Sequence, residues 1–257
     1  MKRLLTAVLL IPCILYVVYF GPFWLLFGVT ALVAVICFSE YSGIAAAYGV
    51  EKAGPIGYAA GLLVLVMRPQ DTLLALTLLA LAALTLALRV SDLAKLLPQA
   101  AFLFFGIVYI FGAWRFAILL RGQSAHWLAY ALVLNWIGDG CAYYTGKSLG
   151  RHKLAARISP QKTWEGSAAS LAGSVIFGVL YLTRVLGVPP IEAGLLSVAA
   201  NVAGQAGDLA ESGLKRGAGV KDSSSLLPGH GGLLDRVDST LFALPVVYLK
   251  LYLDTHP

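Results

Sequence analysis

Charged side chains are scarce in this sequence: Asp, Glu, Lys and Arg make up 12% of its 257 residues, whereas 59% of the residues are hydrophobic. A typical soluble domain carries roughly 25% charged and 45–50% apolar residues, so the chain has too little charge to cover a soluble surface. The shortage excludes a soluble enzyme, a disordered chain and a nucleic-acid partner, in spite of a sequence pI of about 9.2. The 27 Gly and 11 Pro residues show no fixed period, which excludes a fibrous protein.

Cysteine is rare as well. The chain contains only Cys13, Cys37 and Cys141, each in an apolar stretch and none at the spacing of a metal site. An odd number of scattered thiols argues against a disulfide framework. We interpret the three residues as small buried hydrophobes.

Long apolar runs fill most of the sequence. Each membrane-spanning helix needs about 20 apolar residues, which leaves little of this chain for a separate soluble domain. We therefore expect an all-α, polytopic integral membrane bundle with about nine transmembrane segments. Breakers and charges place these segments at roughly 4–20, 23–39, 54–67, 72–90, 99–120, 126–145, 167–186, 190–212 and 238–253.

The first apolar run resembles a signal peptide, but no small-residue cleavage site follows it and Gly21-Pro22 leads into another run. We expect it to remain as the first span. With nine spans, the N-terminus and the loops 146–166 and 213–237 lie on one side, together with 14 of the 19 Lys and Arg residues. The positive-inside rule makes that side cytoplasmic. The absence of a transit peptide favours a bacterial inner membrane.

Charge divides the chain into two functional halves of one integrated membrane domain. We interpret residues 1–125 as transmembrane scaffold helices. Glu40 and Arg115 lie near expected span ends in this half, where snorkelling of the side chain toward the membrane surface explains them. Residues 126–257 read as the catalytic region, because the window 139–238 alone holds eight acids and ten cations. A charge at the bilayer centre costs about 2.5–3.5 kcal/mol, so acids within spans usually serve function.

Two carboxylate pairs have helical spacing. Asp208 and Glu211, followed by Ser212 and Lys215, fall at i, i+3, i+4 and i+7 on one helix face, and Asp235 and Asp238 repeat the i, i+3 spacing. Oxygen ligands of this kind suit Mg²⁺, which keeps several of its waters. The pattern therefore indicates a magnesium site at the membrane edge, with interhelical ion pairs as the alternative interpretation.

Glycines and cations alternate in the loops around these pairs. One stretch runs from Lys215 to Asp222 and continues at Pro228-Gly-His-Gly-Gly, and the other is Ser159-Pro-Gln-Lys-Thr-Trp-Glu-Gly. Such loops let the backbone approach a phosphate while the side chains neutralise it. Binding of lipid headgroups by basic loops is the alternative, although it leaves the accompanying acids unexplained.

These stretches resemble the signature of the phosphatidate cytidylyltransferases, also called CDP-diacylglycerol synthases. The resemblance covers 139–238 and rests on Ser212–Asp222, Pro228–Asp238, Gln205–Ser212, Ser159–Gly166 and Asp139–Lys147. Gly140-Cys141 stands where the family has a hydroxyl residue followed by Gly, and Ser223–Ser225 lacks a Gly often found there. The resemblance implies transfer of the cytidylyl group of CTP to phosphatidic acid at the lipid bilayer, with Mg²⁺, a possible second monovalent cation and a possible homodimer.

The resemblance and the spacing together assign roles to individual residues. The expected catalytic residues are Asp208, Asp235, Lys215, Arg216, Lys221, Asp222, Arg236 and Asp238. The expected substrate-binding residues are Ser159, Lys162, Thr163, Glu165, Ser212, His230, Gly231, Gly232, Asp139 and Lys147. The expected metal ligands are Asp208, Asp235, Asp238 and Glu211.

Two other functions stay open at this point. A related enzyme could move the cytidylyl group to another membrane lipid phosphate, since acyl-chain contacts are generic apolar surface. An ion-coupled transporter would use the acids as an ion pathway. Transporters often carry internal repeats, whereas the polar residues here are confined to one half of the chain.

Overall fold

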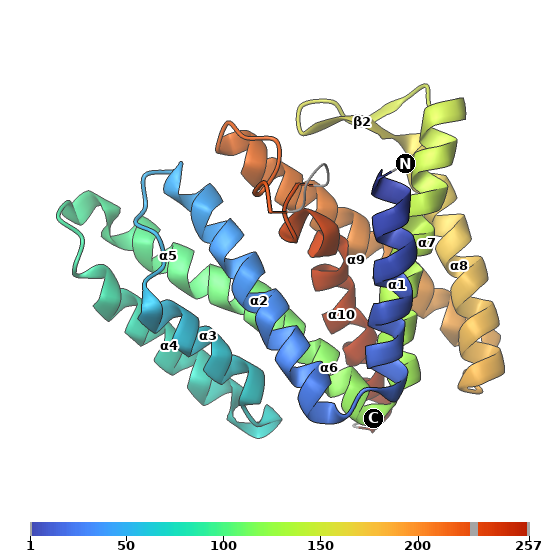
Figure 1. Ribbon diagram of the computed structural model, residues 1–257, viewed down its shortest axis with the longest axis horizontal. Helices are drawn as coiled ribbons and strands as arrows, with labels where there is room; N and C mark the ends of the chain where they lie inside the picture. The colour runs from blue at the N-terminus through green and yellow to red at the C-terminus, as the bar shows by residue number, and fades with distance from the viewer. Residues whose placement is uncertain (1, 227–230, 256–257) are drawn as a thin grey trace. The chain divides into compact units, whose positions relative to one another are not determined.

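The structure, a computed structural model, describes residues 2–226 and 231–255 (Figure 1). Within these residues it is mostly helical, with nine helical segments close to the positions expected from the apolar runs. Their bounds are α1 Lys2–Phe20, α2 Phe23–Ala46, α3 Pro55–Val66, α4 Thr72–Ala87, the continuous helix Leu93–Gln123, α7 Ala125–Leu149, α8 Trp164–Val185, α9 Pro190–Gly217 and α10 Leu234–Thr255. The expected helical membrane architecture is confirmed.

The continuous helix Leu93–Gln123 is built from four pieces. It begins with the 3₁₀ turn η2 (Leu93–Lys95), continues as α5 (Leu96–Ile107), widens into the π-helical turn η3 (Val108–Gly112) and ends as α6 (Ala113–Gln123). A further 3₁₀ turn, η1 (Pro69–Asp71), precedes α4. A single π-helical turn inside an α-helix re-aims the side chains around it.

Three helices among the described residues are long and apolar enough to cross a membrane. They are Phe23–Ala46, Leu93–Gln123 and Trp164–Val185, and they are accompanied by the shorter apolar helices Leu10–Phe20, Pro55–Val66 and Thr72–Ala87. The chain is therefore a multi-pass membrane protein. Nine separate crossings stay a prediction, because several helices are shorter or more polar than a full span requires.

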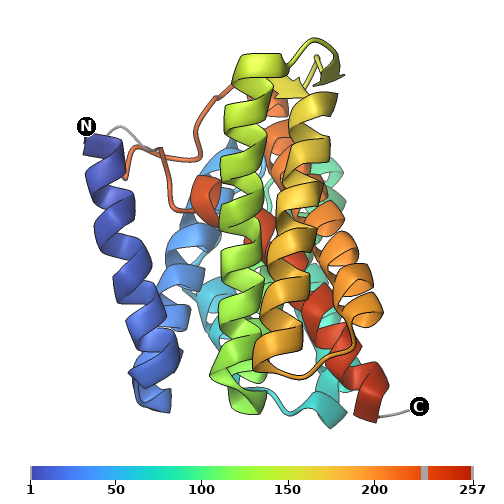
Figure 2. The same ribbon diagram turned by 90° about the vertical axis from the view of Figure 1, so that its right-hand side faces the viewer.

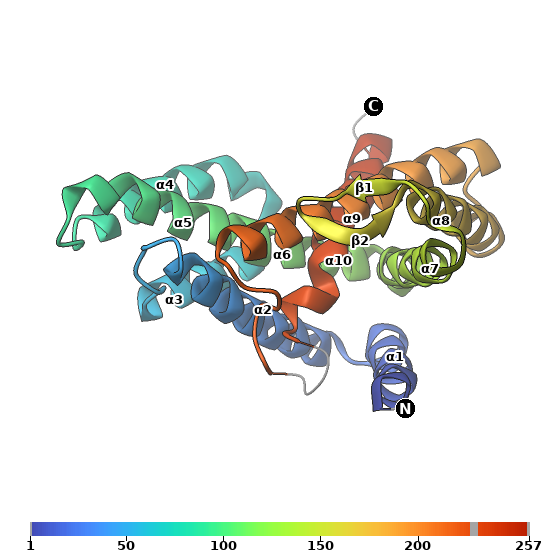
Figure 3. The same ribbon diagram turned by 90° about the horizontal axis from the view of Figure 1, so that it is seen from above.

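One element departs from the all-helical expectation. Strand β1 (Lys153–Ala155) pairs antiparallel with β2 (Ser159–Thr163), with Lys153 opposite Thr163. This hairpin lies against the adjoining ends of α7 and α8 (Figure 3). Its strands are short and lack the apolar alternation by which strands are recognised in a sequence.

The chain packs as two compact units. Unit 1 comprises Met1–Pro22, Leu119–Gly213 and Arg236–Pro257, and unit 2 comprises Phe23–Ile118 and Leu214–Asp235. Helices α9 and α10 each continue from one unit into the other. The functional division at residue 125 stays a prediction, since each unit draws on both halves of the chain.

Small and polar residues join the central helices of unit 1. Helices α7 and α8 run side by side (Figure 2), and Gly138 of α7 faces Ser170 and Ser174 of α8 and Asn201 of α9. A Cβ at Gly138 would lie 2.7–2.8 Å from their polar atoms. Such close approach, with hydrogen bonds between helices, commonly stabilises helix packing in membrane bundles.

An aromatic core fills unit 2. The ring of Tyr41 stacks on that of Phe102 at 5.4 Å, and Phe38 meets Phe111 edge-on at 5.3 Å. Arg115, which is 7% exposed, donates from Nη1 to the Val64 carbonyl near the end of α3 at 2.9 Å. Snorkelling was the wrong explanation for Arg115, because it is buried and binds a backbone acceptor at a helix C-terminus.

Gly61 gives unit 2 a testable packing contact. A Cβ at this position would overlap the ring of the buried Phe111, whereas a Cβ at Gly43 of α2 would meet no atom within 4 Å. We expect Gly61→Ala to lower the free energy of unfolding by about 1–3 kcal/mol, the usual cost of overpacking. Gly43→Ala is the matched control and should be neutral or slightly stabilising. Thermal unfolding in detergent measures both, and equal melting temperatures would contradict the expected overlap.

Candidate active site

Four carboxylates gather in unit 1. Asp139 comes from α7, Asp208 and Glu211 from α9, and Asp238 from the first turns of α10. Asp238 lies within electrostatic reach of the other three. Glu211 is 0% exposed and Asp238 is 7% exposed, so this charge is concentrated where water is scarce. Mutual repulsion of such groups favours a bound cation.

Lys162 brings a positive charge to this carboxylate cluster, defined as Asp139, Asp208, Glu211 and Asp238. The β-hairpin carries Lys162 on β2, and its Nζ lies 2.5 Å from Oδ2 of Asp208. Arg236 and Lys162 both act electrostatically on Asp139. The structure thus joins residues expected in two separate motifs, through a hairpin that the sequence did not predict.

Other residues of the 146–166 loop have structural partners. Thr163 caps the N-terminus of α8, where its Oγ1 accepts a hydrogen bond from the Gly166 amide at 3.2 Å. Glu165 lies 2.6 Å from Nδ1 of His152. Lys147 is exposed, with Nζ 5.8 Å from the ring centroid of Tyr143, and Ser159 begins β2. The contacts of Thr163 and Glu165 fix the hairpin against the start of α8.

A line of amides and hydroxyls continues from the carboxylate cluster between α8 and α9. Gln205, three residues before Asp208, accepts a hydrogen bond from Ser167 at 2.5 Å and donates to Oδ1 of Asn201 at 2.6 Å. Asn201 in turn donates to Ser170 at 3.0 Å. These bonds hold the helix that carries Asp208 against α8.

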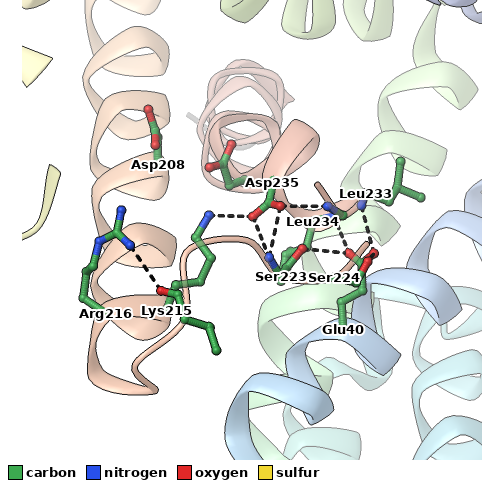
Figure 4. A network of polar contacts seen from close by, with 12 residues as sticks. Glu40, Asp208, Lys215, Arg216, Ser223, Ser224, Leu233, Leu234 and Asp235 are labelled. Atoms are coloured by element: carbon green, nitrogen blue, oxygen red, sulfur yellow. Dashed lines mark hydrogen bonds and ion pairs between the residues drawn. The ribbon is translucent and has the colours of Figure 1, made fainter. Parts of the chain in front are cut away.

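Unit 2 contains a second charged cluster (Figure 4). Asp235 accepts from Nζ of Lys215 at 2.5 Å, from the Ser223 amide at 3.0 and 3.1 Å, and from the Gly232 amide at 2.8 Å. Lys215 is 8% exposed. The carboxylate therefore links the end of α9, the following loop and the start of α10.

Glu40 belongs to this second cluster, and the sequence analysis missed it. Its two carboxylate oxygens accept hydrogen bonds from Ser223, Ser224, Leu233 and Leu234, and only 6% of the residue is exposed (Figure 4). Snorkelling was the wrong explanation for this acid. The signal lay in the helix boundary, since α2 continues to Ala46 and keeps Glu40 inside the helix rather than at its end.

The remaining expected residues are more exposed or have fewer described contacts. Arg216 is exposed and donates from Nη1 to the Val220 carbonyl at 3.2 Å, which closes the end of α9. Lys221 and Asp222 are exposed in the loop, and Ser212 is half-buried on α9. Two neighbouring glycines complete this part of the chain: Gly231, with φ +79°, and Gly232, which is buried. His230 lies outside the described residues.

The donor set suits a hard divalent cation, although it does not form a ready-made site. No group of three or more His, Cys, Asp or Glu side chains in 2–226 and 231–255 is arranged to hold a metal ion. Mg²⁺ is usually bound by only one or two carboxylates, with waters and substrate phosphates completing its shell. The carboxylate cluster, with two buried members, therefore fits magnesium by its chemistry.

Comparison with known proteins places this arrangement in a family. The profile of the cytidylyltransferase family matches residues 1–254. The chain is similar to the phosphatidate cytidylyltransferases of Bacillus subtilis (strain 168), at 41% identity over 159 residues, and of Staphylococcus aureus (strain COL), at 41% over 155 residues. Each match covers 60% of this chain and 59% of the relative, which is less than two thirds of the relative's length. Because the family profile spans nearly the whole chain, the protein belongs to the cytidylyltransferase family.

Proposed function

We propose that the protein transfers the cytidylyl group of CTP to phosphatidic acid, giving CDP-diacylglycerol and pyrophosphate. The observation that carries the proposal is a repeated pairing: Lys162 with Asp208, and Lys215 with Asp235, each at 2.5 Å. Each pair places a phosphate-binding amino group beside a carboxylate that suits a cation. Nucleotidyl transfer needs both, because the triphosphate must be held while its charge is neutralised.

The reaction proposed is a direct in-line displacement. A phosphate oxygen of phosphatidic acid forms a bond to the α-phosphorus of CTP, and the bond from that phosphorus to the β-bridging oxygen breaks. Pyrophosphate leaves with the electron pair. The nucleophile is already an anion, so positioning and charge neutralisation dominate over general-base catalysis.

Lysines and arginines hold the phosphates in this mechanism. Lys162 and Arg236 act beside the carboxylate cluster, and Lys215, Arg216 and Lys221 act from the end of α9 and the loop after it. We assign Mg²⁺ to Asp208, Glu211 and Asp238, with Asp235 one helical turn before Asp238 as a fourth ligand. When bound, Mg²⁺ supplies further neutralisation of the departing pyrophosphate.

The side of the membrane follows from the same chemistry. CTP is cytosolic, and 14 of the 19 cations belong to the N-terminal side as predicted from nine spans. We propose that the N-terminus and the loops 146–166 and 213–237 face the cytoplasm of a bacterial cell. A homodimer and a monovalent cation beside Mg²⁺ are kept as predictions from the family resemblance.

The first test is CDP-lipid formation by the purified full chain in detergent, from radiolabelled CTP and phosphatidic acid. We expect product only when lipid and Mg²⁺ are both present, and we expect chelation with EDTA to abolish it and added Mg²⁺ to restore it. The chelation result follows from charge neutralisation of the leaving group. Product formed equally well in EDTA would contradict the magnesium assignment.

Two alternative outcomes separate the remaining functions. If the folded protein binds CTP but phosphatidic acid gives no product, isoprenoid and ether lipid phosphates are assayed next, and turnover of one of these would redefine the acceptor. If CTP does not bind, the carboxylate cluster would be better explained as an ion pathway. Ion flux into liposomes then tests that transporter function.

A further inference from the structure

We propose that Glu40 is a positioning residue for this reaction: its carboxylate ties together the two ends of the segment 223–234 and so places Asp235 and Lys215. The inference rests on the proposed function for its kinetic part only. It assigns a role in the reaction to a helix of the half that sequence analysis treated as scaffold. The hydrogen bonds of Glu40 go to Ser223, Ser224, Leu233 and Leu234, none of which is expected to meet substrate, so Glu40 acts through the segment that it holds.

The contacts of Glu40 reach both ends of the segment. Oε1 accepts from Oγ of Ser224 at 2.6 Å and from the Leu233 amide at 2.9 Å. Oε2 accepts from Oγ of Ser223 at 3.2 Å and from the Leu234 amide at 2.6 Å. Each oxygen thus receives one hydroxyl and one backbone amide, so that residues about ten positions apart in the chain meet at one carboxylate.

The position of the carboxylate also stabilises the start of α10. Leu234 is the first residue of α10, and its amide and that of Leu233 are among the groups at a helix N-terminus that have no partner within the helix. A negative charge there is favoured by the helix dipole. Glu40 therefore caps α10 from α2, although more than 190 residues separate them in the sequence.

The capped end of α10 carries Asp235, the carboxylate partner of Lys215 on α9. Asp235 follows Leu234 directly, and it accepts from Lys215 and from the amides of Ser223 and Gly232. Ser223 thus binds both carboxylates, with its hydroxyl on Glu40 and its amide on Asp235. Movement of the segment away from Glu40 would therefore displace the acceptor of the Lys215 amino group.

The chemistry requires a carboxylate rather than an amide at residue 40. Both of its oxygens face a backbone N–H of Leu233 or Leu234, which can only donate. In Glu40→Gln one of these amides would face the NH₂ group and lose its acceptor. Gly232 is part of the same fit, because a Cβ there would lie 2.6 Å from Oε1 of Glu40.

Hydrogen exchange tests the anchor without any need for activity. We expect Glu40→Gln and Glu40→Ala to speed exchange by about tenfold or more in peptides that contain Leu233 and Leu234, whose amides lose their acceptor, and in peptides that contain Ser223 and Ser224, whose hydroxyls no longer hold their part of the chain. The matched control is Gln99→Ala. Gln99 is a buried polar residue of the same unit, and its hydrogen bonds described within 2–226 and 231–255 join it to the backbone of Glu51, at 2.7 and 3.1 Å. Its loss should leave these peptides unchanged.

Kinetic coupling tests the positioning role. We expect Glu40→Gln to lower kcat/KM for CTP by about 10- to 100-fold, the size of a lost hydrogen bond to a charged group. Adding Ser224→Ala to Glu40→Gln should lower kcat/KM by less than a further twofold, because the shared contact is already broken. Gln99→Ala should change kcat/KM by the same factor in the Glu40→Gln protein as in the wild type. If Glu40 had only a general structural role, Ser224→Ala and Gln99→Ala would each change kcat/KM by the same factor with and without Glu40→Gln.

The outcomes distinguish this inference from the proposed function. Unchanged exchange in both Glu40 variants, or exchange raised throughout the whole protein, would overturn the anchor. Normal kcat/KM in Glu40→Gln with raised local exchange would overturn the positioning role alone. If the wild-type protein forms no CDP-lipid, the proposed function fails, while the exchange measurement still decides whether Glu40 holds the segment.

Discussion

Replacing Asp208 by Asn is expected to lower kcat for CDP-lipid formation by at least about 10³-fold, with the protein still folded in detergent. Asn keeps the volume of the side chain and removes its charge. The change withdraws one ligand proposed for Mg²⁺ and leaves Lys162, 2.5 Å away, without that counter-charge. Because the Asp208 side chain is 34% exposed, the loss of the pair should cost little stability. Initial rates over a Mg²⁺ series and a thermal melt measure both effects.

The matched control is Glu192→Gln, another acid of helix α9. Glu192 lies in the first turn of the helix, where its Oε2 is 2.8 Å from Nζ of Lys250, and it belongs to neither charged cluster. We expect its kcat to stay within about twofold of wild type, since exposed ion pairs contribute little. Full activity of Asp208→Asn at saturating Mg²⁺ would remove Asp208 from the catalytic set.

Asp235→Asn is expected to impair both activity and stability. Its side chain is 5% exposed and that of its partner Lys215 is 10% exposed, so the substitution leaves a buried amino group without its counter-charge. Removing one partner of a buried ion pair typically costs about 3–5 kcal/mol. The amides of Ser223 and Gly232 also lose a charged acceptor. We therefore expect a clearly lower melting temperature and a fall in kcat of at least about 10³-fold.

An exposed ion pair provides the comparison for Asp235. Asp254 lies 2.5 Å from Nζ of Lys250 on the same helix, α10, and its side chain is 49% exposed. Asp254→Asn should change the free energy of unfolding by less than about 1 kcal/mol and leave turnover intact. Activity is measured well below the melting temperature of the weaker variant, so that unfolding does not contribute. A normal melting temperature for Asp235→Asn would contradict the buried ion pair.

Local sequence patterns were sufficient to predict where the helices lie and which residues are neighbours on one helix face. The apolar runs and their breakers located all nine helical segments of the described residues, because length and hydropathy are properties of consecutive residues. The i, i+3 spacing placed Asp208 beside Glu211 for the same reason. Helix ends were less certain, and the expected end of the second span before Glu40 hid a buried acid inside α2.

Tertiary structure alone decided which distant groups meet. Composition and spacing are local properties, and they predicted a helical membrane protein with acids, lysines and glycines in its second half. The sequence contained no sign that Lys162 would reach Asp208 from a hairpin, nor that Glu40 would hold Leu233 and Leu234. Those contacts join segments far apart in the chain, and their partners are selected by packing and by the need of buried charges and amides for one another.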